Sequence, residues 1–413
     1  MSIVKDQQYY KFCFYGFLKN LRFFDAFFIL FLLEKDLSYT AIGSLYAIRE
    51  ITINLSEIPT GILADTFGRK NALASSFILY IISFLLFYAG QDYWVFLSAF
   101  IFYGIADAFR SGTHKAMIMK YLKLNHWHTH KVDYYGHTRA CSQRGAALSA
   151  LVAGIIVFIN GNYNTIFLIS SIPYIINLFL ILSYPKELNL PPKKERLSFI
   201  DTLKNTWQML KQPQVLSIIH SAAIFTAYQK SLKDYIQPLM QKVALILPVL
   251  VGFESKKRIG LLIGIMYFIL YLLTANASKF SGKIGLNKQR KYAIYTLFLG
   301  LLIGTISGLA YEYKYWYVAL VFFSFIYLIE NVRKPLLTGL LADEVPNKIL
   351  ASAISAQSLY RTLLTAVLSL LLGFSIDRFG MGKALIFVGI LLLIINYIII
   401  YSSKTKLKRK LID

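Results

Sequence analysis

The chain has 413 residues, of which 56% are hydrophobic and only 16% are charged. A soluble protein of this length needs more charge to cover its surface, so that class is excluded. The net charge of +23 does not indicate a nucleic-acid-binding protein, because such proteins gather their basic residues on one soluble face, and the apolar stretches leave no soluble domain of useful size.

Apolar stretches long enough to cross a bilayer recur along the whole chain, since roughly 20 apolar residues span about 30 Å of hydrocarbon. The polar residues 1–11 lack the features of a cleavable signal peptide, so we expect the first helix to remain in the protein. We predict an all-α membrane protein with twelve spanning helices, at residues 8–33, 38–62, 72–90, 93–118, 136–159, 163–184, 213–241, 258–276, 290–310, 314–336, 349–375 and 380–402.

The longest connection follows the sixth predicted helix. It divides the chain into a six-helix lobe at 1–184, a linker at 185–212, a second lobe at 213–403 and a basic tail at 404–413. The side that carries both termini has about 24 Lys and Arg, against about 7 on the other, and basic loops face the cytoplasm. We therefore expect both termini and the linker on the cytoplasmic side of the inner membrane. The basic run 256–258 is an exception to this charge rule.

A compact motif follows the second predicted helix. It reads Gly-Ile-Leu-Ala-Asp-Thr-Phe-Gly-Arg-Lys from Gly61 to Lys70. A glycine permits close helix packing or a tight turn, and the charged residues can interact with helix ends. These features predict a latch between the second helix and a later one. The gating residues are Glu57, Gly61, Asp65, Gly68, Arg69 and Lys70.

This motif resembles the signature of the second loop in the major facilitator superfamily. The resemblance implies two pseudo-symmetric six-helix lobes that give a central cavity access to each side of the membrane in turn. It also implies that helices 1, 4, 7 and 10 line the cavity. The corresponding run in the second lobe, residues 281–291, keeps glycines and basic residues but has no aspartate, so we expect an asymmetric latch.

Charged side chains recur inside the predicted helices. A charge at the bilayer centre costs roughly 2.5–3.5 kcal/mol on an insertion scale. Such groups therefore face water, pair with one another or reach the membrane surface. Arg22 and Asp25 are one helical turn apart, and Asp107, Arg110 and His114 share a helix face. They could fix helix packing as ion pairs, or they could form a polar central site.

Most of these charges fall on the cavity-lining helices that the resemblance implies, or on their neighbours, which favours a central site. Cations outnumber carboxylates, and guanidinium groups bind carboxylate or phosphate groups well. We therefore expect an anionic solute: a carboxylate metabolite, a siderophore or an organophosphate. The candidate substrate-binding residues are Arg22, Arg110, His114, Arg144, Lys230, Glu330, Lys334 and Arg361.

Energy coupling needs a group that can change protonation. The candidates are Asp25, Asp107 and His114. The chain lacks a glycine-rich nucleotide-binding loop, so we expect proton-coupled symport or antiport rather than ATP hydrolysis. The expected partners are a small-molecule substrate, protons and membrane lipids, with no nucleic acid, and we expect a monomer.

Two further patterns bear on metal and disulfide sites, and we expect no cofactor. His126, His128 and His130 could bind a transition metal, but their spacing fits no structural zinc site, and a solvated cytoplasmic loop is the favoured interpretation. Cys13 and Cys141 fall in separate helices and suggest neither a disulfide framework nor a metal site. A proton-driven multidrug antiporter is an alternative, although the fifth helix lacks the glycine–proline pattern typical of that group. A polytopic membrane enzyme is disfavoured, because the loops show no nucleophile and base in a catalytic arrangement.

Overall fold

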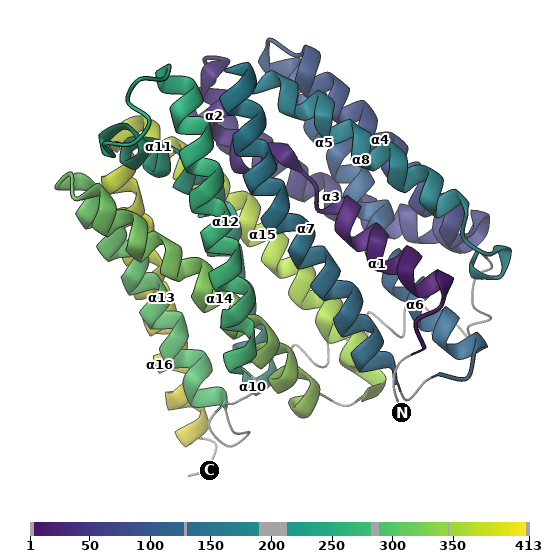
Figure 1. Ribbon diagram of the computed structural model, residues 1–413. Coiled ribbons are helices and arrows are strands. Elements are labelled where there is room, and N and C mark those ends of the chain that lie inside the picture. The colour runs from purple at the N-terminus through teal and green to yellow at the C-terminus, as the bar shows by residue number, and fades with distance from the viewer. Residues whose placement is uncertain (1–3, 128–129, 190–212, 282–288, 346, 410–413) are drawn as a thin grey trace. The chain divides into compact units, whose positions relative to one another are not determined.

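The computed structural model describes residues 4–127, 130–189, 213–281, 289–345 and 347–409. Within these ranges the regular structure is helical (Figure 1). The first half contains α1 (Gln7–Lys19), η1 (Phe23–Ala26), α2 (Phe28–Glu34), α3 (Tyr39–Phe67), α4 (Arg69–Ala89), α5 (Tyr93–Arg110), α6 (Thr113–Leu124), α7 (Lys131–Asn160), α8 (Asn164–Leu182) and η3 (Lys186–Leu188). The second half contains α10 (Pro213–Leu232), η4 (Lys233–Tyr235), α11 (Ile236–Ile246), α12 (Ser255–Ser281), α13 (Gln289–Glu312), α14 (Trp316–Glu344), α15 (Asn347–Phe379) and α16 (Met381–Arg409).

These elements form the twelve predicted spans, with three corrections. The spans predicted at 8–33, 93–118 and 213–241 were expected to be continuous helices, and each is interrupted. In the described part of the chain, nine helical stretches are long and apolar enough to cross a membrane. The predicted first, second and seventh spans are not among them. These three spans carry several charged residues each, among them residues predicted for the candidate site and the gating motif, and these charges lower their mean hydropathy.

The chain divides into two compact units. The first contains Met1–Leu37, Ile48–Lys194 and Met240–Leu272, and the second contains Ser38–Ala47, Glu195–Leu239 and Leu273–Asp413. The first unit is therefore built mainly from α1–α8 and the second mainly from α10 and α13–α16. Residues 190–212 lie outside the described residues, so the predicted linker at 185–212 and the lobe boundaries on either side of it stay predictions.

An aromatic core fills the first unit. The ring of Phe167 on α8 lies 4.5 Å from that of Phe31 and 5.1 Å from that of Phe87, and Phe28 packs edge-on against Phe87 at 5.2 Å. Such ring pairs add to the packing of large apolar side chains. This core joins α2, α4 and α8 and holds the second half of the interrupted first span in place.

The basic run Lys256–Arg258 is the exception to the charge rule for loops, and each of its three residues has a partner in the fold. Lys256 pairs with Glu34 at 2.5 Å and Lys257 with Glu254 at 3.8 Å. The Arg258 guanidinium donates to the carbonyls of Ala244, Leu245 and Leu247, which end α11. Cations are favourable at the carbonyl end of a helix. These three residues therefore have local structural partners that account for their presence in this loop.

Asp377 of α15 caps the start of α3. Its carboxylate accepts hydrogen bonds from the backbone N–H groups of Tyr39 at 3.0 Å and Thr40 at 2.7 Å. The first N–H groups of a helix have no partner within the helix. Here the cap comes from a different helix. The same carboxylate therefore satisfies the first N–H groups of α3 and joins α3 to α15.

We predict that Asp377→Ala lowers stability by about 0.5–2 kcal/mol, the usual effect of removing a helix cap. Thermal unfolding of the purified protein in detergent measures the loss. Asp377→Asn should cause a smaller loss, because its single amide oxygen can still accept from one of the two N–H groups, which bond to different carboxylate oxygens. An unchanged unfolding temperature in Asp377→Ala would show that this cap does not stabilise the fold.

Candidate functional site

The first membrane span is broken between Lys19 and Phe23. Arg22 has φ −98° and ψ 84°, outside the helical region, and a short 3₁₀ turn, η1, follows before α2 begins. In lipid every backbone polar group needs a partner within the protein, so a break must be satisfied from neighbouring helices. The expectation of one continuous helix at 8–33 was wrong, because local hydropathy does not report such support.

One face of α8 supplies partners for the backbone at this break. Ser170 Oγ accepts from the N–H of Phe23 at 3.2 Å, and Tyr174 Oη donates to the carbonyl of Lys19 at 3.0 Å. Asn177 Nδ2 donates to the carbonyl of Tyr15, one turn earlier, at 3.2 Å. The three donors and acceptors are spaced i, i+4 and i+7, so they line one helix face.

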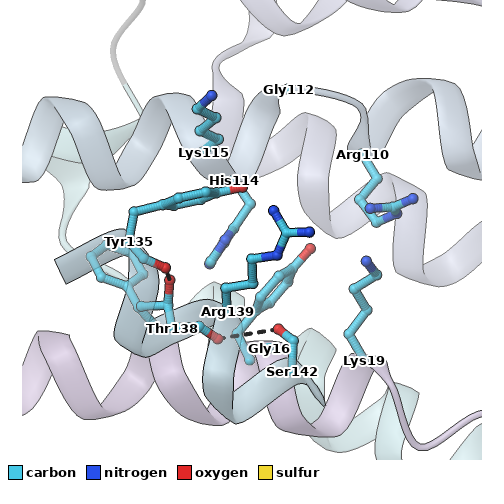
Figure 2. Close-up of a pocket in the computed structure, with 12 residues that line it drawn as sticks. Gly16, Lys19, Arg110, Gly112, His114, Lys115, Tyr135, Thr138, Arg139 and Ser142 are labelled. Atoms are coloured by element: carbon cyan, nitrogen blue, oxygen red, sulfur yellow. Dashed lines mark hydrogen bonds between the residues drawn. The ribbon is translucent and has the colours of Figure 1, made fainter. Parts of the chain in front are cut away.

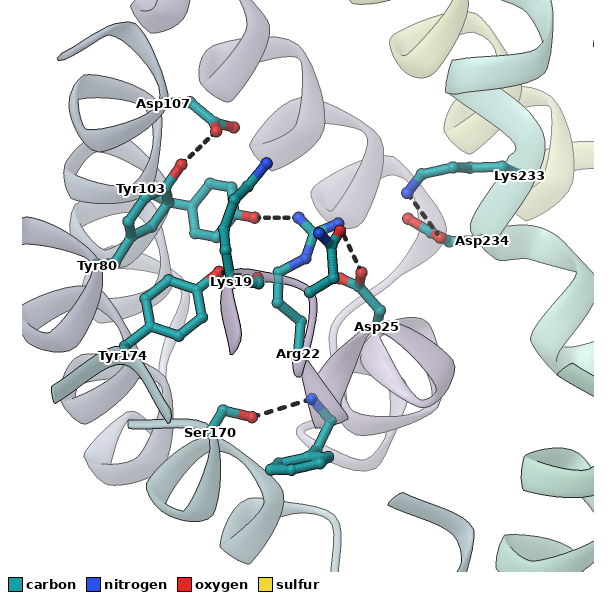
Figure 3. A network of polar contacts seen from close by, with 12 residues as sticks. Lys19, Arg22, Asp25, Tyr80, Tyr103, Asp107, Ser170, Tyr174, Lys233 and Asp234 are labelled. Atoms are coloured by element: carbon teal, nitrogen blue, oxygen red, sulfur yellow. Dashed lines mark hydrogen bonds and ion pairs between the residues drawn. The ribbon is translucent and has the colours of Figure 1, made fainter. Parts of the chain in front are cut away.

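The break carries a half-buried ion pair (Figure 3). Arg22 lies 2.9 Å from the Asp25 carboxylate, and its guanidinium also donates to Tyr103 Oη of α5 at 2.8 Å. Two predicted site residues are thus joined, and the predicted proton-coupling carboxylate Asp25 is paired with a predicted substrate-binding cation. Opening this pair would free both charges at the centre of an interrupted helix.

A second break lies in the fourth span. Helix α5 ends at Arg110 and α6 begins at Thr113, with Gly112 at φ +71° between them, a conformation that favours glycine. Asp107 pairs with Arg110 at 2.6 Å. Tyr80 Oη donates to the Asp107 carboxylate and accepts from Arg110 Nε at 3.0 Å. The span predicted at 93–118 is therefore two helices that reach Leu124.

A cavity of about 240 Å³ opens beside this second break (Figure 2). Its cationic lining comes from three spans: Lys19 on α1, Arg110 at the end of α5, Lys115 on α6 and Arg139 on α7. No carboxylate is among its lining residues in the described chain. The uncharged or neutral lining residues are Phe12, Tyr15, Gly16, Gly112, His114, Tyr135, Thr138 and Ser142.

Three of these cations form no ion pair with a carboxylate in the described part of the chain. Within the described residues, the Lys19 ammonium and the Arg139 guanidinium make no hydrogen bond and no ion pair. Lys115 lies over the ring of Tyr135 at 5.4 Å. Arg110 alone is paired, with Asp107. The cavity therefore holds unbalanced positive charge, which attracts an anion.

His114 is packed into the wall of this cavity. Its ring stacks on Tyr15 at 3.7 Å and lies edge-on to Phe12 at 5.4 Å. Its Nε2 is 3.4 Å from Tyr184 Oη. The sequence grouped His114 with Arg110, and the structure brings both residues to this cavity.

The cavity also contains residues that the sequence analysis did not select. Lys115, Tyr135, Thr138, Arg139 and Ser142 all line it. The last four are spaced i, i+3, i+4 and i+7, so a search for polar faces on the fifth span could have found them. They were missed because the predicted helix at 136–159 began inside this polar face.

Arg144 lies at a different place. It lines a groove of about 630 Å³ with Cys13, Phe14, Cys141 and other residues of α1 and α7, and it is not among the residues that line the cationic cavity. Helical spacing grouped Arg144 with His137 and Cys141, and that face of α7 differs from the face with Thr138 and Ser142 that lines the cavity.

The second span contributes carboxylates outside the cavity lining. Glu50 is only 2% exposed and lies 3.2 Å from the guanidinium of the adjacent Arg49. Glu57, which the sequence assigned to the gating motif, accepts from Ser111 Oγ at 3.2 Å. Glu57 thereby joins α3 to the break between α5 and α6.

The gating motif forms the turn between α3 and α4. Gly68 has φ +94°. The N–H of Arg69 donates to the carbonyl of Asn189, and the N–H of Lys70 to its Oδ1. Lys70 Nζ donates to the carbonyl of Tyr184 at 2.9 Å. The motif thus holds the segment that follows α8, and the latch between the second helix and a later one stays a prediction.

In the second unit, the seventh span is also interrupted. Residues Lys233–Tyr235 form the 3₁₀ turn η4 between α10 and α11. Asp234, which is 8% exposed, lies 3.4 Å from Lys233 and accepts from Tyr46 Oη at 2.8 Å. The continuous helix expected at 213–241 was wrong. A charged pair therefore marks the break in the seventh span, as Arg22 and Asp25 mark the break in the first.

The tenth span, α14, carries Arg333, whose contacts are structural, and the site candidate Glu330. Arg333 is 1% exposed and donates to Ser221 on α10 and to Ala293 and Thr296 on α13, so it ties three helices together. Glu330 is 7% exposed and accepts from Thr226 Oγ1 at 2.8 Å.

The remaining candidates in this unit differ in exposure. Lys334 and Arg361 lie within electrostatic reach of Glu330, and Arg361 also donates to Ser358 Oγ at 2.8 Å. Lys334 is exposed, whereas Lys230 is half-buried on α10. Substrate binding by Lys230, Glu330, Lys334 and Arg361 stays a prediction.

The loop with His126, His128 and His130, whose histidines could bind a transition metal, lies only partly within the described residues. His128 lies outside the described residues, and the described residues contain no group of three or more His, Cys, Asp or Glu side chains placed to hold a metal ion. His220, which the sequence analysis did not select, contacts Tyr360 Oη at 2.8 Å and Asn396 Oδ1 at 3.1 Å. It is a core histidine with both ring nitrogens in polar contact.

Interrupted membrane helices, half-buried ion pairs at the breaks and a polar cavity define a polytopic membrane protein with a polar interior, an architecture typical of solute transporters. The chain belongs to the major facilitator superfamily, whose family model matches residues 14–367. It is therefore a multi-pass membrane transporter that binds a small molecule, and not an enzyme. The resemblance drawn from Gly61–Lys70 is confirmed.

Known proteins resemble the chain over nearly its whole length. An uncharacterised MFS-type transporter of Bacillus subtilis (strain 168), YxaM, is 23% identical over 396 residues, which cover 93% of this chain and 92% of that protein. The structure of a bacterial homologue of the human lysosomal transporter Spinster, in an inward-facing and unoccupied conformation, matches with a TM-score of 0.73 at 14% identity, covering 98% of each chain.

A second solved structure, that of the nucleoside transporter NupG, matches with a TM-score of 0.71 at 12% identity and covers 96% of this chain and 99% of that one. At such identities the likeness concerns the fold alone. It confirms the predicted fold class of twelve transmembrane helices in two six-helix lobes.

We predict that Ser170→Ala lowers stability by about 1–3 kcal/mol, because the N–H of Phe23 at the break then loses its partner in a buried place. Thermal unfolding in detergent measures the loss. Ser171→Ala is the matched control, since the Ser171 hydroxyl bonds only to Phe167 of its own helix. If both variants unfold at the wild-type temperature, Ser170 does not support the break.

Proposed function

We propose that this protein carries a small anionic solute across the cytoplasmic membrane, coupled to protons, with both termini in the cytoplasm. The observation that supports the anionic substrate is the cavity lined by Lys19, Arg110, Lys115 and Arg139 without a lining carboxylate. A bound anion would supply the negative charge that these cations lack. The chain is proposed to act as a monomer.

The cavity also bears on the size of the solute. Its volume of about 240 Å³ lies below the range of roughly 300–1,000 Å³ typical of sites for drug-sized ligands. A short carboxylate or a small phosphate ester suits this space better than a siderophore. The hydroxyls of Tyr135, Thr138 and Ser142 offer further hydrogen bonds to carboxylate or phosphate oxygens.

Backbone geometry adds a second reason for an anion. Gly112 and the first residues of α6 line the cavity beside Arg110. The first N–H groups of a helix lack partners within the helix and favour negative charge. An anion in the cavity would therefore meet both side-chain cations and a helix N-terminus, as anion sites in proteins commonly combine them.

For proton coupling we propose Asp107 as the principal carrier, with Asp25 and His114 as further candidates. Asp107 is held by Arg110, a lining residue of the cavity, and by Tyr80. An anion that attracts Arg110 would weaken the ion pair and leave Asp107 free to take up a proton. Substrate binding and protonation would then favour each other, which is the requirement for symport.

A proton-driven multidrug antiporter is the second candidate. It is supported by the groove lined by Tyr10, Phe14, Phe17 and Leu180, which would accept an apolar molecule. The charge of the 240 Å³ cavity favours the anionic substrate over this candidate.

We predict that small dicarboxylates and phosphate monoesters raise the unfolding temperature of the purified protein, because a ligand of the folded state stabilises it. Amines of similar size should not. Stabilisation by cations alone would overturn the anionic assignment.

We further predict that Lys19→Gln and Arg139→Gln each weaken binding of the anion found in this way about tenfold or more, since a charge-assisted hydrogen bond is worth about 1.5–3 kcal/mol. Calorimetric titration measures the affinity. Lys257→Gln is the control, because Lys257 pairs with Glu254 and does not line the cavity. Wild-type affinity in both cavity variants would exclude this cavity as the anion site.

Asp107→Asn should abolish uptake driven by a pH gradient in proteoliposomes, while exchange of labelled for unlabelled anion continues, because exchange needs no net proton movement. Tyr80→Phe keeps the carboxylate and should keep the response to the gradient. Full gradient-driven uptake in the Asp107→Asn variant would remove Asp107 as the carrier.

A further inference from the structure

Helices α1 and α7 lie side by side in a fixed register (Figure 1). Tyr9 Oη is 2.9 Å from His137 Nδ1, and these residues are 128 positions apart in the chain. Phe17 and Gly145 have the same separation, and a Cβ placed on Gly145 would lie 3.1 Å from the Cα of Phe17. The equal separations show that the two helices run in the same direction, with matching turns opposite each other.

Cys13 and Cys141 lie midway between these two contacts and have the same separation along the chain. They therefore face each other across the helix pair, and both line the same groove. The helices are close here, because a Cβ on Gly16 would lie 2.5 Å from Ser142 Oγ. Both cysteines are free thiols, and the chain has only these two.

The pair is accessible from one side. Cys13 and Cys141 line the groove of about 630 Å³ that also receives Arg144. Cys13 is 8% exposed and Cys141 is half-buried. The thiolate is the reactive form of a cysteine. Because Cys141 is more exposed than Cys13, it is the thiol that a small oxidant meets first, and Cys13 is placed to react with the product.

We propose that Cys13 and Cys141 form a redox-sensitive thiol pair, which peroxides convert to an intramolecular disulfide that fixes α1 against α7. The Cys141 thiolate attacks one peroxide oxygen and becomes a sulfenic acid. The second oxygen leaves as hydroxide and takes up the thiol proton to form water. Cys13 then attacks the Cys141 sulfur, the S–O bond breaks, and the oxygen leaves with the Cys13 proton as a second water.

In this reaction two thiols lose two electrons and hydrogen peroxide is reduced to two waters. Thiol reductants reverse it by thiol–disulfide exchange. The crosslink would constrain two helices that also line the cationic cavity, since Gly16 and Lys19 come from α1 and Thr138 and Arg139 from α7. Its formation does not depend on the nature of the transported solute.

The test uses the full-length protein in proteoliposomes, treated with hydrogen peroxide. Free thiols are then counted with a maleimide after denaturation, and peptides are mapped by mass spectrometry without reduction. We expect both thiols to be lost together, a single linked pair of peptides that contain Cys13 and Cys141, and recovery of two thiols with dithiothreitol. Crosslinks between molecules, or independent oxidation of each cysteine to sulfinic acid, would overturn the proposal.

Cys13→Ser and Cys141→Ser are the matched controls, because each keeps one thiol that has no partner within the molecule. Neither should give a linked peptide pair within one chain. A second measurement needs no substitution: the oxidised wild-type protein should unfold at a higher temperature than the reduced one, because the crosslink restricts the unfolded chain, and dithiothreitol should reverse the shift. A linked protein with an unchanged unfolding temperature would show that the disulfide does not fix α1 against α7.

Discussion

Inside a membrane, each backbone N–H and carbonyl group needs a partner within the protein, and this requirement governs where the spans can be interrupted. The first span breaks after Lys19 because α8 presents Ser170 and Tyr174 to the freed backbone. The break then places Arg22 and Asp25 in one ion pair. The Arg22 guanidinium of this pair also donates to Tyr103 of α5, so the break joins α8, the first span and α5.

Charge balance follows from the same geometry. Cations within the helices of this protein fall into two groups that the sequence alone does not distinguish. Arg333 and Arg258 have their guanidinium groups occupied by carbonyls and hydroxyls of neighbouring helices, and their role is to hold the fold. Lys19 and Arg139 instead direct their charges toward a shared cavity, where an anionic ligand would neutralise them.

The two cysteines show how contact between helices creates chemistry from residues that look inert in the sequence. Cys13 and Cys141 fall in separate helices, and composition suggested two buried thiols with no further role. The small residues Gly16 and Gly145 let α1 and α7 approach closely, and the matched register places the thiols opposite each other. A reactive pair therefore arises from packing.

The sequence by itself determined the twelve helical spans, the charged residues within them and the motif Gly61–Lys70, because each is a property of a continuous stretch of chain. It therefore predicted the fold class and the family, and it selected Arg22, Asp107 and Arg110 as site residues. Only the tertiary structure decided where the first, fourth and seventh spans break and which cations share a cavity. Those outcomes depend on partners far away in the chain, such as Ser170 for Phe23, 147 residues apart, and hydropathy or helical spacing within one segment carries no information about such partners.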